Sequence, residues 1–274
     1  MKFATIESYV GKTPFIAKPN ARFLYDMILD QKLTRIIELG IGHGTATCYM
    51  AAALHELGTG LITCVDLLEP TFPFNPSAEE QLQLAGLSQF VEITRMETGY
   101  TWFLHDDIVR HTTNDRCEEV YDLCIIDGPK NWTIDGAAFF LVDKLLKKNG
   151  WIIFDDYNWT YAYASEVIGR ETTDGITHRQ LSRTERDTPQ VKAVFELLVK
   201  QHPSYSNLIV LEETDWALAQ KTISGDKRYT IRCNESYKDV VGKIYGKARR
   251  FVRGVSRRQL TYKPDLSPGP RVYG

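Results

Sequence analysis

The stretch Arg35-Ile-Ile-Glu-Leu-Gly-Ile-Gly-His-Gly-Thr45 joins an apolar run to three glycines at every second position. At Gly40, Gly42 and Gly44 a side chain would keep a ligand from lying against the peptide backbone. We predict a strand over 35–39 and a helix over 45–57, whose first turn directs free amide groups and the positive end of the helix dipole toward this loop. The segment is therefore typical of a site for a polar ligand with an adenosine-like body, although a tight turn without a ligand is the plainer interpretation of the glycines alone.

The spacing of the glycines distinguishes two kinds of nucleotide site. A dinucleotide fingerprint reads G-x-G-x-x-G, whereas this motif reads E-x-G-x-G-x-G from Glu38. A second apolar run, Leu61 to Val65, ends in Asp66, and an acid at the tip of a second strand can accept hydrogen bonds from both hydroxyls of a ribose. With Glu38, the three glycines and Asp66, the chain resembles the class I S-adenosylmethionine-dependent methyltransferases.

Apolar runs alternate with helical patterns along the chain, as in a parallel sheet that helices cover on both faces. We predict an α/β fold with a Rossmann-like, doubly wound, mostly parallel sheet of seven strands. The strands are expected at 35–39, 61–66, 90–94, 121–127, 150–155, 207–212 and 216–220. The helices are expected at 21–30, 45–57, 77–85, 99–109, 134–146 and 189–201, and 157–187 is interpreted as a lid or substrate loop.

Two of the expected strands end in acids, at Asp127 and at the pair Asp155 and Asp156. Because the carboxyl ends of parallel strands share one edge of a sheet, these aspartates are expected on the same rim as the glycine loop. Three converging carboxylates would repel one another, and a hard divalent cation such as Mg²⁺ is the simplest way to hold them together. The alternative is that one or two of them only cap helices or hold loops.

These acids narrow the resemblance to the metal-dependent O-methyltransferases, which include catechol O-methyltransferase and the macrocin-type sugar O-methyltransferases. In that family, an acid after the fourth strand and an acidic pair after the fifth bind the metal, and Asp127, Asp155 and Asp156 match those positions. The catechol branch also has a lysine as general base three residues after the first acid, where this chain has Lys130.

The resemblance extends over about residues 13–221 and differs from the sugar branch at one point. That branch has a second acid, its proposed base, where this chain has Pro129, so the assignment does not transfer. The family holds the adenine just after the third strand, which places Glu97 beside the cofactor, and Asp127 is also expected to contact it.

The resemblance implies an S-adenosylmethionine-dependent O-methyltransferase, assisted by Mg²⁺, that methylates a hydroxyl of a small molecule such as a sugar, a phenol or a natural product. Mg²⁺ would lower the pKa of the hydroxyl, and Lys130, its own pKa depressed by the nearby cation, would accept the proton. Two other classes stay open: a nucleic-acid methyltransferase that uses the basic tail, and a non-catalytic protein that keeps the cofactor pocket.

The formal net charge of -2 hides two regions of opposite charge. Residues 227–274 contain 13 Lys and Arg against 3 acids, so this tail carries about +10 and residues 1–226 about -12. We predict a methyltransferase domain over 1–226 and a basic, partly helical tail over 227–274. Such a tail can bind the acidic surface of its own or a neighbouring subunit in a homo-oligomer, an anionic membrane, or nucleic acid.

The cysteines and the hydropathy bear on the compartment. The 5 cysteines are odd in number and form no C-x-x-C pair, so neither a disulfide framework nor a zinc site is indicated. No apolar stretch approaches the roughly 20 residues that span a bilayer, and residues 1–7 lack the apolar core of a signal peptide. We expect a cytoplasmic protein without a transmembrane segment.

Overall fold

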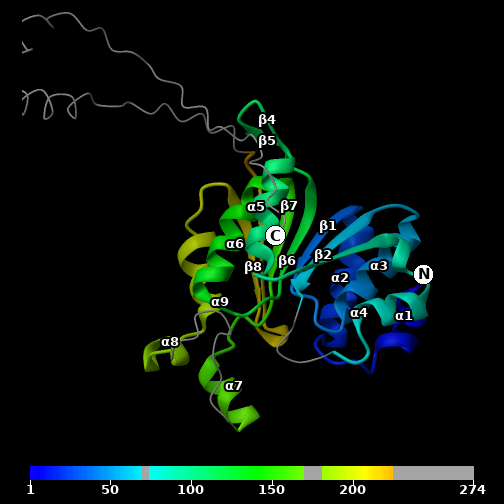
Figure 1. Ribbon diagram of the computed structural model, residues 1–274, viewed down its shortest axis with the longest axis horizontal. Helices are drawn as coiled ribbons and strands as arrows, with labels where there is room; N and C mark the ends of the chain where they lie inside the picture. The colour runs from blue at the N-terminus through cyan, green and yellow to red at the C-terminus, as the bar shows by residue number, and fades with distance from the viewer. Residues whose placement is uncertain (69–73, 170–180, 225–274) are drawn as a thin grey trace, which may run out of the picture. The chain divides into compact units, whose positions relative to one another are not determined.

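The computed structural model describes residues 1–68, 74–169 and 181–224 (Figure 1). Its centre is a seven-stranded sheet in the order β3-β2-β1-β6-β7-β9-β8. The first five strands are parallel, β9 runs antiparallel to its neighbours β7 and β8, and β8 therefore has the direction of the first five. The strands are β1 (Arg35–Leu39), β2 (Leu61–Leu67), β3 (Val91–Met96), β6 (Tyr121–Ile126), β7 (Leu146–Phe154), β8 (Tyr205–Leu211) and β9 (Trp216–Lys221). The predicted doubly wound, mostly parallel sheet is confirmed, and all seven expected strands are present.

The strand order reverses between β1 and β6, which pair directly from Ile36 with Leu123 to Leu39 with Ile126. The chain first runs outward from β1 through β2 to β3, and then returns to the other side of β1. Ligands of open α/β sheets bind at the carboxyl ends of the strands where the order reverses. The topology therefore predicts a ligand site at the loops that follow β1 and β6.

Helices cover both faces of the sheet (Figure 1). Neighbouring residues of β1 point to opposite sides, so Ile36 belongs to one buried apolar cluster and Ile37 to the other. This burial on two faces explains why the central strands read as continuous apolar runs. The first cluster includes α1 (Phe3–Val10), α2 (Lys18–Gln31), α3 (Thr45–Leu57) and α4 (Ala78–Ala85). The second includes α5 (Tyr100–Arg110), α6 (Trp132–Leu145), α9 (Gln190–Val194) and the π-helical turn η2 (Phe195–Val199).

The interpretation of 157–187 as a loop is wrong where the structure describes it. Two short helices, α7 (Tyr161–Ile168) and α8 (Arg183–Asp187), flank residues 170–180, which lie outside the described residues. Thr160 caps the first, and Ser182 with Glu185 forms a capping box on the second. Further short elements are η1 (Ser88–Phe90), β4 (Thr112–Thr113), β5 (Arg116–Cys117) and η3 (Glu212–Thr214).

The chain divides into two compact units, residues 1–224 and 225–274. The second lies outside the described residues, and so does the predicted basic tail over 227–274 with its expected partners. Within 1–68, 74–169 and 181–224, no helix combines the length and the apolar character that crossing a membrane requires.

Candidate active site

The glycine loop joins β1 to α3, and its backbone has positive φ at Gly40, Gly42 and Gly44, with values of 90°, 49° and 74°. A Cβ atom at Gly40 would overlap the carbonyl oxygen of Asp127, and one at Gly44 would overlap Ala78. Two of the three glycines are therefore required by contacts within the protein itself. These contacts and the positive φ values fix the shape of the loop.

Asp66, at the carboxyl end of β2, holds this loop from the side. Its Oδ2 atom accepts hydrogen bonds from the backbone N–H groups of Ile41 and Gly42, both at 3.1 Å. Its Oδ1 atom accepts from the N–H of Leu67 at 2.7 Å, and Arg95 lies 3.7 Å from Oδ2. Asp66 thus lies beside the loop as expected, and its contact with a ribose stays a prediction.

Glu38 lies beneath the loop, between β1, α3 and β2, with 1% of its surface exposed. Thr47 and Cys64 donate hydrogen bonds to its Oε2 atom at 2.5 and 3.4 Å. Burial raises the pKa of Glu38 to about 7, although both hydrogen bonds oppose that shift. The structure therefore gives Glu38 a supporting contact with α3. Its contact with a cofactor stays a prediction, as does that of Glu97, which is exposed just after β3.

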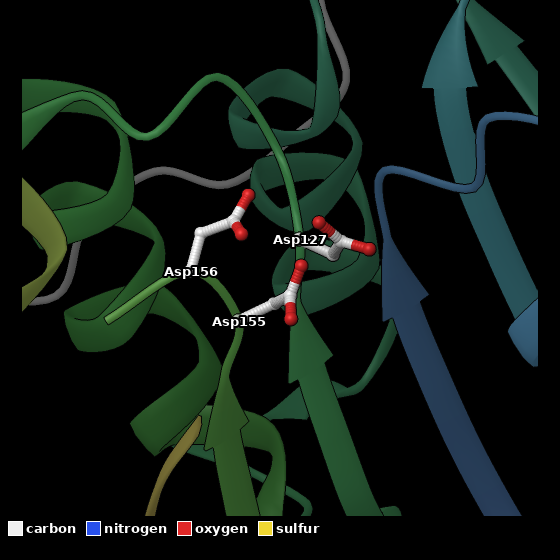
Figure 2. Close-up of side chains that lie close together, drawn as sticks. All are labelled: Asp127, Asp155 and Asp156. Atoms are coloured by element: carbon white, nitrogen blue, oxygen red, sulfur yellow. The ribbon is translucent and has the colours of Figure 1, made fainter. Parts of the chain in front are cut away.

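The three aspartates that follow β6 and β7 converge at the rim of the sheet (Figure 2). One carboxylate oxygen of each lies within 4.8 Å of those of the other two. The backbone fixes this arrangement, because Asp127 N–H donates to Leu39 at 2.8 Å and Asp155 N–H donates to Ile126 at 3.1 Å. Asp127, Asp155 and Asp156 are thus brought together as the strand ends predicted, next to the glycine loop.

Lys130 provides the positive charge at the centre of this cluster. Its ammonium group donates a hydrogen bond to Asp127 and lies 3.3 Å from Asp155 Oδ2 and 3.2 Å from Asp156 Oδ2. The side chain is buried, with 9% of the residue exposed. Three carboxylates against one ammonium leave two negative charges when all four groups are ionised.

The proton equilibria of the cluster follow from this crowding. Burial raises the pKa of Asp127 well above its ordinary value, and the charge of Asp155 adds to the effect. Burial also favours the neutral form of Asp155, but the charge of Lys130 and the hydrogen bonds from Asp127 and Trp216 outweigh it and lower the pKa. Asp127 and Asp155 therefore share a proton, with Asp155 the more ionised partner.

The same charges act on Lys130. Burial alone would lower its pKa, but Asp127, Asp155 and Asp156 outweigh burial and raise the pKa well above the ordinary value. The depressed pKa that the sequence suggested is therefore absent from this arrangement. Lys130 is an ammonium donor here, and a role as base requires another cation to take over its carboxylate partners.

Three aromatic side chains contact the aspartates or the loop between them, and no pattern in the neighbouring sequence predicts these contacts. Trp216, the first residue of β9, donates from Nε1 to Asp155 Oδ1 at 2.5 Å. Tyr100 packs so closely against Gly128 that a Cβ atom there would overlap its ring, and Tyr161 donates to the carbonyl of Pro129 at 2.8 Å. The loop between Asp127 and Lys130 is thus held from both sides. Knowledge of how β9 pairs with β7 is needed to place Trp216 beside Asp155.

Comparison with known proteins adds a family match and a fold match. Residues 37–157 match the family model described as a methyltransferase domain. The O-methyltransferase from Bacillus cereus in complex with SAH is 19% identical with a TM-score of 0.52, and covers 81% of this chain and 92% of its own. No curated relative matches the chain at a significant level.

Two further crystal structures have the same fold. TomG from Streptomyces achromogenes, an O-methyltransferase involved in tomaymycin synthesis and bound to SAM, is 16% identical with a TM-score of 0.54, and covers 81% of this chain and 92% of its own. SAH-bound PaMTH1, a methyltransferase from Podospora anserina, is also 16% identical with a TM-score of 0.54, and covers 81% and 87%. Residues 37–157, which contain both the glycine loop and the three aspartates, match a methyltransferase domain, and the described sheet has the fold of these methyltransferase structures.

Proposed function

We propose that this enzyme transfers the methyl group of S-adenosylmethionine to a hydroxyl oxygen of a small molecule, with a divalent cation held by Asp127, Asp155 and Asp156. The observation that carries the proposal is the convergence of three carboxylates within 4.8 Å beside the glycine loop. The solved structures of similar fold named O-methyltransferases support it.

The residues of the cluster fit a hard cation such as Mg²⁺. All three offer carboxylate oxygens, the ligands that Mg²⁺ prefers, and their excess of two negative charges over Lys130 equals the charge of the ion. The raised pKa of Asp127 also favours a bound cation, because burial and the charge of Asp155 make the ionised form of Asp127 costly. When bound, the ion would lower the pKa of an acceptor hydroxyl and orient its oxygen.

The remaining chemistry belongs to the chain and its two substrates. The acceptor oxygen forms a bond to the methyl carbon as the carbon–sulfur bond breaks, S-adenosylhomocysteine leaves, and the hydroxyl proton passes to a base. Lys130 is our candidate for that base, provided that a bound cation takes over Asp155 and Asp156, which lie within 3.3 Å of its amine and otherwise keep it protonated. Trp216 orients Asp155 by donating to the oxygen that Lys130 does not contact.

The test is calorimetric titration of the full chain with S-adenosylhomocysteine and with Mg²⁺, in the wild type and in an Asp155→Asn, Asp156→Asn double variant. We expect both proteins to bind S-adenosylhomocysteine and only the wild type to bind Mg²⁺. An Asp106→Asn, Asp115→Asn variant, which removes two exposed acids elsewhere, should keep both sites. A wild type that binds S-adenosylhomocysteine but no divalent ion contradicts the metal-assisted mechanism.

Lys130 is tested separately, by methyl transfer to a panel of phenols and sugars. Loss of a general base lowers the rate about 10²- to 10⁴-fold, so we expect such a loss in Lys130→Met with S-adenosylhomocysteine binding retained. Lys130→Arg should not restore the rate, because a guanidinium keeps its proton. Full activity of Lys130→Met would remove the base role, and cofactor binding without turnover on any acceptor would favour the non-catalytic alternative.

A further inference from the structure

Lys130 lies where the loop after β6 leads into helix α6. Its φ of 58° is left-handed, a conformation that residues other than glycine rarely adopt. Such a conformation persists only where the surrounding structure holds it in place. The position of the Lys130 ammonium group among the aspartates therefore depends on the contacts that fix the chain on either side of this residue.

Side chains bind three backbone N–H groups in the first turn of α6. Asn131 caps the helix, because its Oδ1 atom accepts hydrogen bonds from the N–H groups of Thr133 and Ile134 at 2.9 and 3.1 Å. The N–H of Trp132, the first residue of the helix, donates to Oε1 of Gln190 at 2.7 Å. The first N–H groups of a helix have no acceptor within the helix itself, so these two side chains determine where α6 begins.

Gln190 connects this turn to a distant part of the chain. It is the first residue of α9, and its Nε2 atom donates to the backbone carbonyl of Glu185 in α8 at 2.9 Å. Only 7% of Gln190 is exposed, so loss of either hydrogen bond would leave a buried polar group without a partner. Gln190 therefore ties the N-terminus of α6 to α8.

Close packing between α6 and α9 keeps this connection rigid. A Cβ atom at Gly136, in the second turn of α6, would lie 3.1 Å from the side chain of Leu198 and 3.9 Å from that of Val194. The two helices thus approach each other too closely for a larger residue at this point. Their spacing is set by packing, and the place where α6 begins is set by Gln190.

The α7–α8 segment also contacts the chain on the other side of Lys130. Tyr161, the first residue of α7, donates to the carbonyl of Pro129 at 2.8 Å. Arg186 of α8 donates to Ser165 of α7 at 2.7 Å, which joins the two helices. One segment therefore holds the backbone just before and just after the left-handed residue.

We propose that Gln190 is a positioning residue for the methyl transfer. By holding the N–H of Trp132 against α8, it keeps the amine of Lys130 beside the aspartates, where the acceptor hydroxyl is deprotonated. A shift in the first turn of α6 would move that amine, and a misplacement of about 1 Å can cost about 100-fold in rate. This inference rests on the proposed function, because it concerns the base of the same reaction.

The first test measures the protection of Lys130 without any substrate. The full chain is acetylated with acetic anhydride in EDTA, and each lysine is quantified by peptide mass spectrometry. Gln190→Met can form neither hydrogen bond, and we expect it to speed acetylation of Lys130 at least about threefold through local opening. Lys221 is the internal control, because it is 2% exposed and donates to the carbonyl of Leu146 at the opposite end of β7, and it should stay protected.

A second variant removes the same hydrogen bond from its donor. Trp132→Pro has no backbone N–H, and a helix accepts proline at its first position. Asn131 already has the extended backbone that a residue before proline requires, with φ of -111° and ψ of 127°. We expect faster acetylation of Lys130 here as well, and wild-type acetylation in Trp132→Phe, which keeps the N–H.

Two glutamine variants serve as further controls. Gln190→Glu can still accept from the N–H of Trp132 and should keep most of the protection. Gln81→Met removes another buried amide with two hydrogen bonds, since Gln81 of α4 is 3% exposed, accepts from Thr13 and donates to the carbonyl of His43. It should leave the acetylation of Lys130 as in the wild type.

The second test asks whether Gln190 acts through Lys130, using the phenols and sugars that the wild type methylates. We expect Gln190→Met to lower kcat at least about tenfold and to leave the affinity for S-adenosylhomocysteine unchanged. In a Lys130→Met background the same substitution should have no further effect on kcat, because the two residues act as one unit. A residue that only stabilises the fold would lower the rate by the same factor in both backgrounds.

Three results would overturn the inference: unchanged acetylation of Lys130 in Gln190→Met or in Trp132→Pro, acetylation of Lys130 that rises together with that of Lys221, or equal rate losses in the two backgrounds. If Lys130→Met loses activity while Gln190→Met does not, the proposed base stands and only the role of Gln190 is wrong. If Lys130→Met keeps the wild-type rate, the proposed base fails, and a positioning role for Gln190 fails with it.

Discussion

Lys130 Nζ and Asp156 Oδ2 lie 3.2 Å apart, and both residues have a left-handed backbone, with φ of 58° and 57°. Residues other than glycine rarely adopt this conformation, and such residues cluster at sites where function requires a particular geometry. The loops after β6 and β7 therefore each hold one half of this ion pair in a conformation that free chains avoid. Both halves belong to the cluster that we propose to bind metal.

The fit of the glycine loop against Asp127 predicts a large loss of stability for Gly40→Ala. An alanine at position 40 would have to adopt a left-handed backbone conformation, which costs about 1 to 2 kcal/mol. Its methyl group would also overlap the main-chain carbonyl of Asp127, which adds about 1 to 3 kcal/mol. Urea unfolding measures the change. Gly58→Ala is the matched control, because its φ of 76° imposes similar strain but no atom lies within 4 Å of the new Cβ. Equal losses in the two variants would contradict the proposed close contact.

The hydrogen bond from Trp216 predicts that Trp216→Phe weakens metal binding. Phenylalanine keeps an apolar ring but cannot donate to Asp155, and loss of a partner that orients a metal ligand lowers metal affinity about 10- to 100-fold. Calorimetric titration with Mg²⁺ measures the effect. Trp151→Phe removes an indole N–H that donates to Gln31 at 2.8 Å, away from the aspartates, and should bind Mg²⁺ like the wild type. If both variants or neither lost affinity, the bond to Asp155 would have no specific role.

The buried carboxyl of Glu38 predicts a pH dependence of stability. Its pKa is about 7 in the folded protein against an ordinary value of 4.5, so between these values the folded state holds a proton that the unfolded state has released. Stability therefore falls as pH rises through this window, and the penalty, on the order of 3 kcal/mol, is complete above pH 7. Glu38→Gln carries no charge, so its stability relative to the wild type should rise between pH 4.5 and 7 and then level off.

Urea unfolding at pH 4, 6 and 8 tests this difference. Glu92→Gln, at an exposed position of β3, should differ from the wild type by a constant amount across the series. A constant difference for Glu38→Gln as well would mean that Glu38 is ionised in the folded protein. The same variant also tests the predicted cofactor role, because a purely supporting contact leaves the affinity for S-adenosylhomocysteine unchanged.

The elements whose bounds the sequence predicts correctly are those next to residues, such as glycine, that end a strand or a helix. The glycine loop follows the strand Arg35–Leu39 and precedes the helix Thr45–Leu57, which ends at Gly58, and both elements have the predicted bounds. The acids at the ends of β6 and β7 could be placed on one rim because parallel strands share a direction. Helix α1 was not predicted, since Lys2 at its N-cap makes no side-chain hydrogen bond.

The contacts that complete the site depend on tertiary pairing. Trp216 and Asp155 are 61 residues apart in the sequence, and they meet because β9 runs antiparallel to β7. Asn20 contacts Thr214 across 194 residues. No local pattern specifies either contact, and neither could be inferred before the strand order was known.

The contact between Gly40 and Asp127 limits which substitutions the two loops can accept. The two loops meet through main-chain atoms, with the N–H of Asp127 donating to Leu39 and the carbonyl of Asp127 packed on Gly40. Substitutions that leave these main-chain contacts in place keep the spacing between the two loops. The distance from the glycine loop to the aspartates is therefore set by main-chain atoms, and Gly40 is a position where a larger residue would change it.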